Sequence, residues 1–341
     1  MKGNKVSIEE MRELHNVISI DVRSPSEYKE GTIPGAINIP LFEDEERTKV
    51  GTVYKQICTE RAKDLGYKIV EPKLPHILEQ IKSASQNVDD NIILFCWRGG
   101  MRSQSLKDYC NEMGLKVVYL SGGYKAYRRL VHSFLSDITN IPEMVVLNGL
   151  TGVGKTDLLS LLSERKIPTI DIEKIANNRG SVFGQIHGGN QPSQKAFEAE
   201  IFENVCNNQL NYSVIECESK RIGKLYIPDS VFQKMKTGKQ IHLYASLKTR
   251  VDRLIVDYAT FPEERLIDAI LHLKKALGRN KMNNLIDLVN EKRFDEVATI
   301  LLKDYYDPLY GYPTGKVADY DLSVNCDNLN HAAEEIIDYL K

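Results

Sequence analysis

The sequence predicts an α/β protein of two domains, each built on a mainly parallel β-sheet. Short runs of β-branched and other apolar residues alternate with helical patterns along most of the chain, as they do in α/β units. The runs that predict strands are VISIDV (17–22), NIILFCW (91–97), KVVYL (116–120), MVVLNG (144–149), YSVIE (212–216) and QIHLYA (240–245). A chain of 341 residues is long enough for two such domains, each with its own core.

A polar segment with a proline, SDITNIPEM (136–144), separates one complete set of strands and helices from the next. We therefore expect an N-terminal domain over residues 1–138 and a C-terminal domain over residues 139–341. Between about 262 and 303 the pattern changes to long amphipathic helix. Its interruption from Gly278 to Asn284 predicts a helical hairpin inserted in the C-terminal domain.

Composition limits the kinds of partner and compartment. The formal net charge is −2, so any nucleic acid has to be held by local basic patches rather than by the field of the whole molecule. The six cysteines show no C-x-x-C pair, and no run of 18 apolar residues occurs in the sequence. We expect a reduced, cytoplasmic protein with no membrane-spanning segment.

The N-terminal domain carries a cysteine in a positively charged, glycine-rich turn. In the stretch ILFCWRGGMRS, Cys96 ends a predicted strand, and Gly99 with Gly100 allows several backbone N–H groups to converge on one point. Arg98 and Arg102 add positive charge, which favours a thiolate and any anion beside it. An inert buried thiol needs neither feature, so the pattern predicts a catalytic cysteine or an oxyanion site.

The C-terminal domain contains a Walker A phosphate-binding motif. The stretch VVLNGLTGVGKTDLL matches G-x-x-x-x-G-K-[ST] directly after a predicted strand and before a helical pattern. Backbone N–H groups of such a loop surround phosphates, Lys155 neutralises them, and Thr156 can ligate a magnesium ion. The residues assigned to phosphate binding are Gly149, Gly152, Gly154, Lys155 and Thr156. The motif does not identify the phosphate compound.

Three further segments, NNRGSVFG (177–184), QPSQKAFE (191–198) and ECESKRIGKLYIP (216–228), fall in connections at one edge of the second predicted sheet. Ligands of open α/β sheets collect outside the carboxyl ends of the strands. The candidate substrate contacts in these segments are Arg179, Ser181, Gln194, Glu218, Ser219 and Arg221. Taken singly, each of these residues also fits an ordinary surface turn.

Residues 5 to 135 resemble a rhodanese domain, through the ordered set ISIDVRSPSEYKEGTIPGAINIP, ILFCWRGGMRS and LSGGYKAYRRL. Two features depart from the common pattern. Thr32 stands where many rhodaneses have histidine, and the interval from Cys96 to Arg102 is C-x5-R, one residue longer than the usual sulfurtransferase loop and similar to the phosphatase version of this fold. A longer loop can enclose a tetrahedral anion, which suits a phosphatase and a selenophosphate donor equally.

The order of rhodanese motifs, phosphate motif, RGSxFG, QPSQ and ExESxxIG is similar, over essentially the full length, to the tRNA 2-selenouridine synthase family. The resemblance implies a rhodanese-like domain followed by a P-loop NTPase-like domain. It also implies replacement of sulfur by selenium in a wobble 2-thiouridine of tRNA, with selenophosphate as donor and geranyl transfer from geranyl diphosphate as an intermediate step. In this family Cys96 would handle selenium, Arg98 and Arg102 would support it, and Lys155 with Thr156 would hold the diphosphate.

Basic clusters are the direct evidence in the sequence for an RNA partner. Arg221 and Lys224 lie in one cluster, close to Tyr226, and Arg279 with Lys281 lies in another. We expect the anticodon loop of tRNA to contact these basic residues. For the second cluster a solvated helix face is an equally good explanation, because acidic residues flank it on both sides.

Two other functions fit the same motifs. One is a P-loop small-molecule kinase or ATPase fused to a sulfurtransferase, because Lys248, Arg250 and Arg253 follow a predicted strand as basic residues do in nucleotide kinases. The other is a rhodanese-fold phosphatase or a noncatalytic signalling module. Assays of phosphate release from ATP and from a phosphate ester would separate these functions from a tRNA-modifying transferase.

Overall fold

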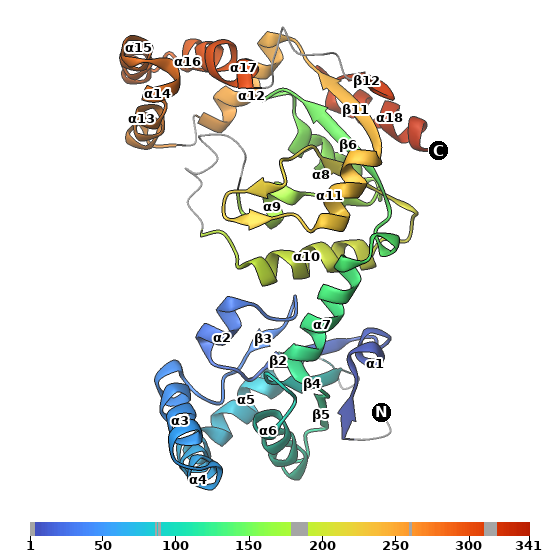
Figure 1. Ribbon diagram of the computed structural model, residues 1–341, viewed down its shortest axis with the longest axis vertical. Coiled ribbons are helices and arrows are strands. Elements are labelled where there is room, and N and C mark those ends of the chain that lie inside the picture. Colours follow the sequence, from blue (N-terminus) through green and yellow to red (C-terminus); the bar gives the residue numbers. More distant parts are fainter. Residues whose placement is uncertain (1–3, 86, 88–89, 179–189, 259–260, 310–318) are drawn as a thin grey trace. The chain divides into compact units, whose positions relative to one another are not determined.

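The structure is a computed structural model that describes residues 4–85, 87, 90–178, 190–258, 261–309 and 319–341 (Figure 1). These residues form two compact units. The N-terminal unit is Met1–Phe134 with Ser193–Glu200, and the C-terminal unit is Leu135–Pro192 with Ile201–Lys341. The helix α10 (Gln194–Cys206) therefore belongs to the N-terminal unit over its first residues and to the C-terminal unit over the rest.

The N-terminal unit is built on a parallel sheet with the strand order β1-β5-β4-β2-β3. The strands are β1 (Lys5–Val6), β2 (Val17–Asp21), β3 (Ile37–Asn38), β4 (Asn91–Phe95) and β5 (Val117–Leu120). The helices are α1 (Ile8–Arg12), α2 (Pro25–Glu30), α3 (Asp44–Gln56), α4 (Thr59–Val70), α5 (Leu74–Ala84), α6 (Met101–Glu112) and α7 (Gly123–Ser136). Buried apolar side chains of α5 and α6 pack against β2 and β4, so the central strand β4 holds Cys96 at its carboxyl end in a rigid frame.

The C-terminal unit contains a second parallel sheet, with the strand order β12-β11-β6-β8-β7, and a short antiparallel hairpin of β9 and β10. The strands are β6 (Glu143–Gly149), β7 (Thr169–Ile170), β8 (Tyr212–Glu216), β9 (Arg221–Ile222), β10 (Leu225–Tyr226), β11 (Lys239–Tyr244) and β12 (Leu322–Asn325). The helices around them include α8 (Lys155–Glu164), α9 (Ile172–Ile175), α11 (Asp229–Thr237), α12 (Leu247–Tyr258) and α18 (Leu329–Leu340). Buried side chains of α8 and α18 pack against β6, β11 and β12, which places the phosphate motif at the end of the central strand.

The predicted helical hairpin is wrong in detail. The segment forms α13 (Glu263–His272), α14 (Lys274–Leu277), α15 (Arg279–Asn290), α16 (Phe294–Leu301), a π-helical turn at Leu302–Tyr306 and α17 (Asp307–Leu309). The helices α13 to α16 and the π-helical turn share one apolar core with α12 and lie together in Figure 1. The predicted interruption shrinks to Gly278, whose φ is 76°. Burial of Met282 and Leu285 in the shared core outweighs the low helix propensity of the neighbouring asparagines.

The α/β fold class is confirmed, since each of the six apolar runs contains a strand and the strands pair in parallel in both sheets. The strands that the sequence did not predict include β1, β3, β9 and β10, each of only two residues. Among the helices in the described part of the chain, none is long and apolar enough to span a membrane.

Candidate functional site

The first candidate site is the cysteine loop, residues 96–102, between β4 and α6. Cys96 is 3% exposed, and its Sγ lies 3.4 Å from Ser103 Oγ and 4.0 Å from the carbonyl oxygen of Gly100. Burial acts to raise the pKa of the Cys96 thiol. The hydrogen bond with Ser103, the charge of Arg102 and the backbone N–H groups of Ser103 and Arg98 outweigh it and lower that pKa below its usual range. The loop therefore favours the nucleophilic thiolate.

Two glycines fit the cysteine loop against the turn that precedes α7. Gly99 has a φ of 62° and Gly123 a φ of 56°, a region that favours glycine. A Cβ on Gly99 would lie 2.2 Å from the carbonyl oxygen of Leu120, and a Cβ on Gly123 would lie 2.2 Å from that of Cys96. The two turns therefore pack backbone against backbone, which fixes the position of the thiol.

The two predicted arginines of the cysteine loop act differently. Arg102 donates to Glu27 Oε2 at 2.8 Å and is 18% exposed, so its charge is held beside the thiol. The Arg98 side chain is exposed, and Arg98 lowers the pKa of Cys96 through its backbone N–H. Ser103, which the sequence analysis did not single out, contacts the thiol directly. Its place three residues after Gly100, in the first turn of the helix that follows the loop, was the available signal.

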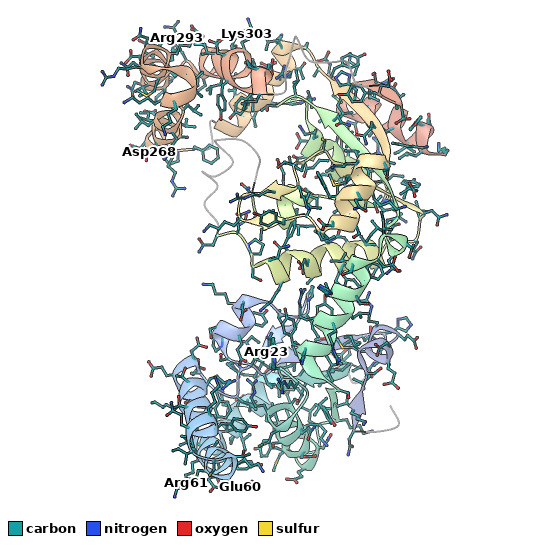
Figure 2. All side chains as sticks on the ribbon, viewed as in Figure 1. Arg23, Glu60, Arg61, Asp268, Arg293 and Lys303 are labelled. Carbon is teal, nitrogen blue, oxygen red and sulfur yellow. The ribbon has the colours of Figure 1, made fainter. Side chains whose placement is uncertain are left out.

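Thr32, at the position where many rhodaneses have histidine, has a structural partner. Its hydroxyl donates to Asp21 Oδ2 at 2.8 Å, and the same carboxylate accepts from Arg23 at 2.5 Å. Both members of this ion pair are buried, and Arg23 lies inside the N-terminal unit (Figure 2). The Arg23 guanidinium lies 4.1 Å from the ring centre of Tyr124. Thr32 thus completes a buried polar network within the N-terminal unit.

The second candidate site is the phosphate loop, residues 149–156, between β6 and α8. Gly152 and Gly154 have φ values of 81° and 91°, which favour glycine. A Cβ on Gly149 would lie 2.8 Å from the carbonyl oxygen of Leu243. Lys155 Nζ donates to the Gly149 carbonyl at 2.8 Å, and so lies over the loop where a phosphate would bind. Thr156 is half-buried at the start of α8.

Two arginines of α12 hold the phosphate loop from outside. Arg250 Nε donates to the Thr151 carbonyl at 2.8 Å, and Arg253 donates to the Val153 carbonyl at 2.7 Å. Arg250 also makes a buried bidentate ion pair with Asp307 of α17, at 2.5 and 3.1 Å. These arginines supported the kinase interpretation. Their guanidinium groups donate hydrogen bonds to loop carbonyls. In this structure they therefore hold the loop in shape, which differs from the direct contact with phosphate that the kinase interpretation expects.

Carboxyl groups gather at the ends of β7 and β8, and one of them, Glu218, is close enough to Lys155 for its charge to act on it. Glu216 is fully buried; its Oε1 accepts from the Glu173 backbone N–H at 3.0 Å, and its Oε2 has no partner among the described residues. Burial and the charge of Glu173 raise the pKa of Glu216 to about 8. The same two causes, partly offset by Lys155, raise the pKa of Glu218 to about 7. Both groups therefore take up protons near neutral pH.

The raised pKa of Glu216 predicts a pH-dependent stability. Between pH 4.5 and about 8 the folded state keeps a proton on Glu216 that the unfolded state has lost. Protonation of Glu216 therefore contributes stability at low pH, and this contribution is lost as pH rises through about 8. Each pKa unit is worth about 1.4 kcal/mol, and Glu216→Gln should remove a few kcal/mol of destabilisation at pH 8.5. Urea unfolding at pH 6 and 8.5 measures this. Glu60→Gln, whose side chain is 77% exposed, is the control; equal pH profiles for wild type and Glu216→Gln would contradict the assignment.

Cys217, in the segment ECESKRIGKLYIP of the C-terminal unit, is the second cysteine to consider as a nucleophile besides Cys96. Burial and the charge of Glu218 raise the pKa of its thiol.

The described residues contain no group of three or more His, Cys, Asp or Glu arranged to hold a metal ion. Magnesium at Thr156 therefore stays a prediction.

The remaining predicted substrate contacts are dispersed. Arg179 and Ser181 lie outside the described residues. Gln194 lies in the first turn of α10, where its amide donates to Glu198 at 3.0 Å. Ser219 donates to the Arg221 carbonyl at 2.6 Å and so shapes the turn before β9. Among those of these residues that the structure describes, Glu218 is the one whose pKa the charge of Lys155 lowers.

The hairpin of β9 and β10 presents basic and aromatic side chains. Arg221 and Lys224 are exposed, and the Arg221 guanidinium lies 5.8 Å from the ring centre of Tyr226, which is 51% exposed. Gln191 fixes the turn, since its Oε1 accepts from the Lys224 backbone N–H at 2.7 Å and its Nε2 donates to the Ile222 carbonyl at 3.0 Å. The QPSQ segment thus contributes a residue that holds the hairpin in place.

The second basic cluster lies at the start of α15. Arg279 and Lys281 are exposed, and Lys281 pairs with Asp304 at 2.7 Å. An acidic partner compensates the charge of Lys281, which favours the solvated helix face over an RNA contact at this position.

Comparison with known proteins extends these observations. A family model described as the tRNA 2-selenouridine synthase AAA domain matches residues 142–340, and a rhodanese-like domain model matches residues 6–130. The chain is 33% identical to the tRNA 2-selenouridine synthase of Shewanella pealeana, over 94% of this chain and 95% of that protein. It is 33% identical to that of Pseudomonas syringae, over 88% and 89%, and 37% identical to that of Nitrosomonas europaea, over 70% and 63%. With both units matched in the expected order, this chain belongs to the tRNA 2-selenouridine synthase family.

Proposed function

We propose that the protein is a transferase that converts a wobble 2-thiouridine of tRNA into 2-selenouridine, with selenophosphate as selenium donor. The observation that carries this proposal is the pairing, in one chain of this family, of a loop that favours a thiolate with a loop that cradles phosphates. Both expected donors are phosphorylated, and each loop suits one of them. Cys96 reacts with the selenium donor, Arg98 and Arg102 stabilise the negative charge there, and the phosphate loop binds a diphosphate.

Geranyl diphosphate is the second co-substrate in this proposal. The sulfur of 2-thiouridine attacks the first carbon of the geranyl group, the carbon–oxygen bond breaks, and diphosphate leaves with the electron pair. The proton at N3 of the base is released, and the sulfur becomes a thioether. Selenium then displaces geranyl thiol from the base more readily than it would displace sulfur itself. Lys155 stabilises the charge that builds on the departing diphosphate.

Mass spectrometry of tRNA nucleosides tests the proposed function directly. Cells that carry the gene should contain 2-selenouridine at the wobble position, and cells from which it is deleted should contain 2-thiouridine there. Purified protein with selenophosphate, geranyl diphosphate and a 2-thiouridine oligonucleotide should reproduce the conversion. Stoichiometric ATP hydrolysis without any change in the nucleosides would favour the kinase or ATPase function instead.

The exposed hairpin predicts where tRNA binds. Reversing the charges of Arg221 and Lys224 to glutamate should weaken tRNA binding and lower the slope of log affinity against log salt by about one for each lost phosphate contact. Thermal stability should hardly change, because both side chains are exposed. Filter binding across a salt series measures the slope. An unchanged slope would place the RNA path elsewhere, with Arg279 and Lys281 the next residues to reverse.

A further inference from the structure

The cysteine loop has features that suit chemistry at phosphorus. Five residues separate Cys96 from Arg102, so the loop is long enough to enclose a tetrahedral anion. The twelve-residue helix α6 begins directly at this loop, and its N-terminus adds partial positive charge and N–H donors. Ser103, in the first turn of α6, is fully buried against the thiol.

Selenophosphate offers a thiolate two atoms to attack. Attack at selenium would form a sulfur–selenium bond and force phosphorus to leave with the electron pair, as phosphite. Attack at phosphorus forms a sulfur–phosphorus bond, and the pair of the phosphorus–selenium bond leaves with selenium as hydrogen selenide. No element changes its oxidation state in the second route, and it needs no further oxidant or reductant.

On the basis of the proposed function, we propose that Cys96 attacks the phosphorus of selenophosphate, releases hydrogen selenide and carries the phosphoryl group as phosphocysteine. Hydrogen selenide then attacks C2 of the S-geranylated base. The carbon–selenium bond forms, the carbon–sulfur bond breaks, the selenide proton passes to N3, and the geranyl thiolate leaves and takes a proton from water. Water then attacks the phosphocysteine, the sulfur–phosphorus bond breaks, and inorganic phosphate and the Cys96 thiolate are regenerated.

Ser103 has a defined part in the last step. Its Oγ lies 3.4 Å from Cys96 Sγ and 3.2 Å from the Gly100 carbonyl, so its single hydroxyl hydrogen can turn to either acceptor. When the sulfur–phosphorus bond breaks, negative charge returns to Sγ, and a hydrogen bond from Ser103 stabilises it. In the first step Ser103 helps to keep Cys96 ionised. In alkaline solution, where the thiolate forms without that help, its remaining part is in the regeneration of the enzyme.

The buried surroundings of the thiol limit access of water to the phosphocysteine and so lengthen its lifetime. Cys96 is 3% exposed, and the glycine contacts of Gly99 and Gly123 keep the loop closed against the turn before α7. Arg102, fixed by Glu27, holds positive charge near the phosphoryl oxygens. Water therefore reaches the phosphorus in a confined geometry, where a single hydrogen bond to the leaving sulfur changes the rate of hydrolysis.

The experiment uses Ser103→Ala in the full chain, with selenophosphate and an S-geranylated oligonucleotide. Acid quench and peptide mass spectrometry should find phosphate on Cys96 at a higher level than in wild type. At alkaline pH, where Cys96 is ionised with or without Ser103, selenation should show a first turnover at the wild-type rate and then a steady state slowed roughly a hundredfold. Ser105→Ala, a half-buried serine in the same turn, should behave as wild type. A merely structural role of Ser103 would slow both phases together.

The outcomes separate this inference from the proposed function. Wild type is assayed for selenation in the same experiment, and a wild type that does not selenate would overturn the proposed function itself. A selenating protein that carries selenium on Cys96, recognised by its isotope pattern, would overturn only the phosphocysteine. So would selenation by Ser103→Ala with neither phosphorus nor selenium on Cys96. Orthovanadate, which mimics phosphorus under attack by a thiolate, should block selenation and leave geranyl transfer unchanged.

Discussion

Replacing Cys96 by serine should reduce selenium transfer to tRNA by a factor on the order of a thousand or more, as loss of a nucleophile does in other enzymes. The Cys96 thiol has a lowered pKa, whereas burial raises the pKa of the Cys110 and Cys326 thiols to about 11. Serine is nearly the same size, so the loop should keep its shape. Incorporation of selenium into a 2-thiouridine oligonucleotide measures the effect, and geranyl transfer should persist.

Cys217→Ser is the matched control for this variant. Its thiol has a raised pKa and stays protonated near neutral pH, so the substitution should leave selenation intact. Full selenation by Cys96→Ser together with its loss in Cys217→Ser would assign the selenium chemistry to the C-terminal unit instead.

Replacing Lys155 by alanine should slow geranyl transfer by a factor on the order of a hundred or more. Lys155 Nζ lies over the phosphate loop at the Gly149 carbonyl, where the proposed function requires it to meet the charge that builds on a departing diphosphate. Binding of tRNA should survive. Selenation of an oligonucleotide that is already geranylated should suffer less than geranylation, because selenophosphate is assigned to the cysteine loop. Single-turnover assays with each oligonucleotide separate the two steps.

Lys239→Ala is the control for the loss of positive charge alone. Lys239 is exposed and lies at the start of β11, at the end of that strand away from the phosphate loop. It should leave geranyl transfer unchanged. Geranyl transfer at the wild-type rate in Lys155→Ala, with ATP or GTP hydrolysis coupled to turnover, would contradict the assignment of the phosphate loop to geranyl diphosphate.

The features that the sequence predicted correctly are those encoded by contiguous residues, namely the longer strands and the loops that follow them. A buried parallel strand is a nearly continuous apolar run, so β4 and β6 and the loops that follow them were visible before the structure. Two-residue strands such as β3 leave no periodic signal. The break expected near Gly278 failed for a different reason, because packing of α15 in a shared core overrides its local propensity.

The supports of the candidate site were hidden for a related reason. Asp307 meets Arg250 across 57 positions of sequence, and Arg250 reaches Thr151 across 99. No spacing rule links residues so far apart, and Arg250 followed a strand in the way that basic residues follow strands in kinases. The motif residues themselves were recognisable because the loop needs glycine and lysine at fixed positions.

The two arginines that hold the phosphate loop also decide which way its amide groups face. In a trans peptide the carbonyl and the next N–H point in opposite directions. With the Thr151 and Val153 carbonyls tied to Arg250 and Arg253, the N–H groups of Gly152 and Gly154 are turned away from α12. The loop is thus shaped before any anion arrives, and an anion that binds there loses little of its binding free energy to ordering the backbone. Asp307 of α17 holds Arg250 in place. The packing of the helical segment that contains α17 therefore helps to order the phosphate loop, and so raises its affinity for an anion.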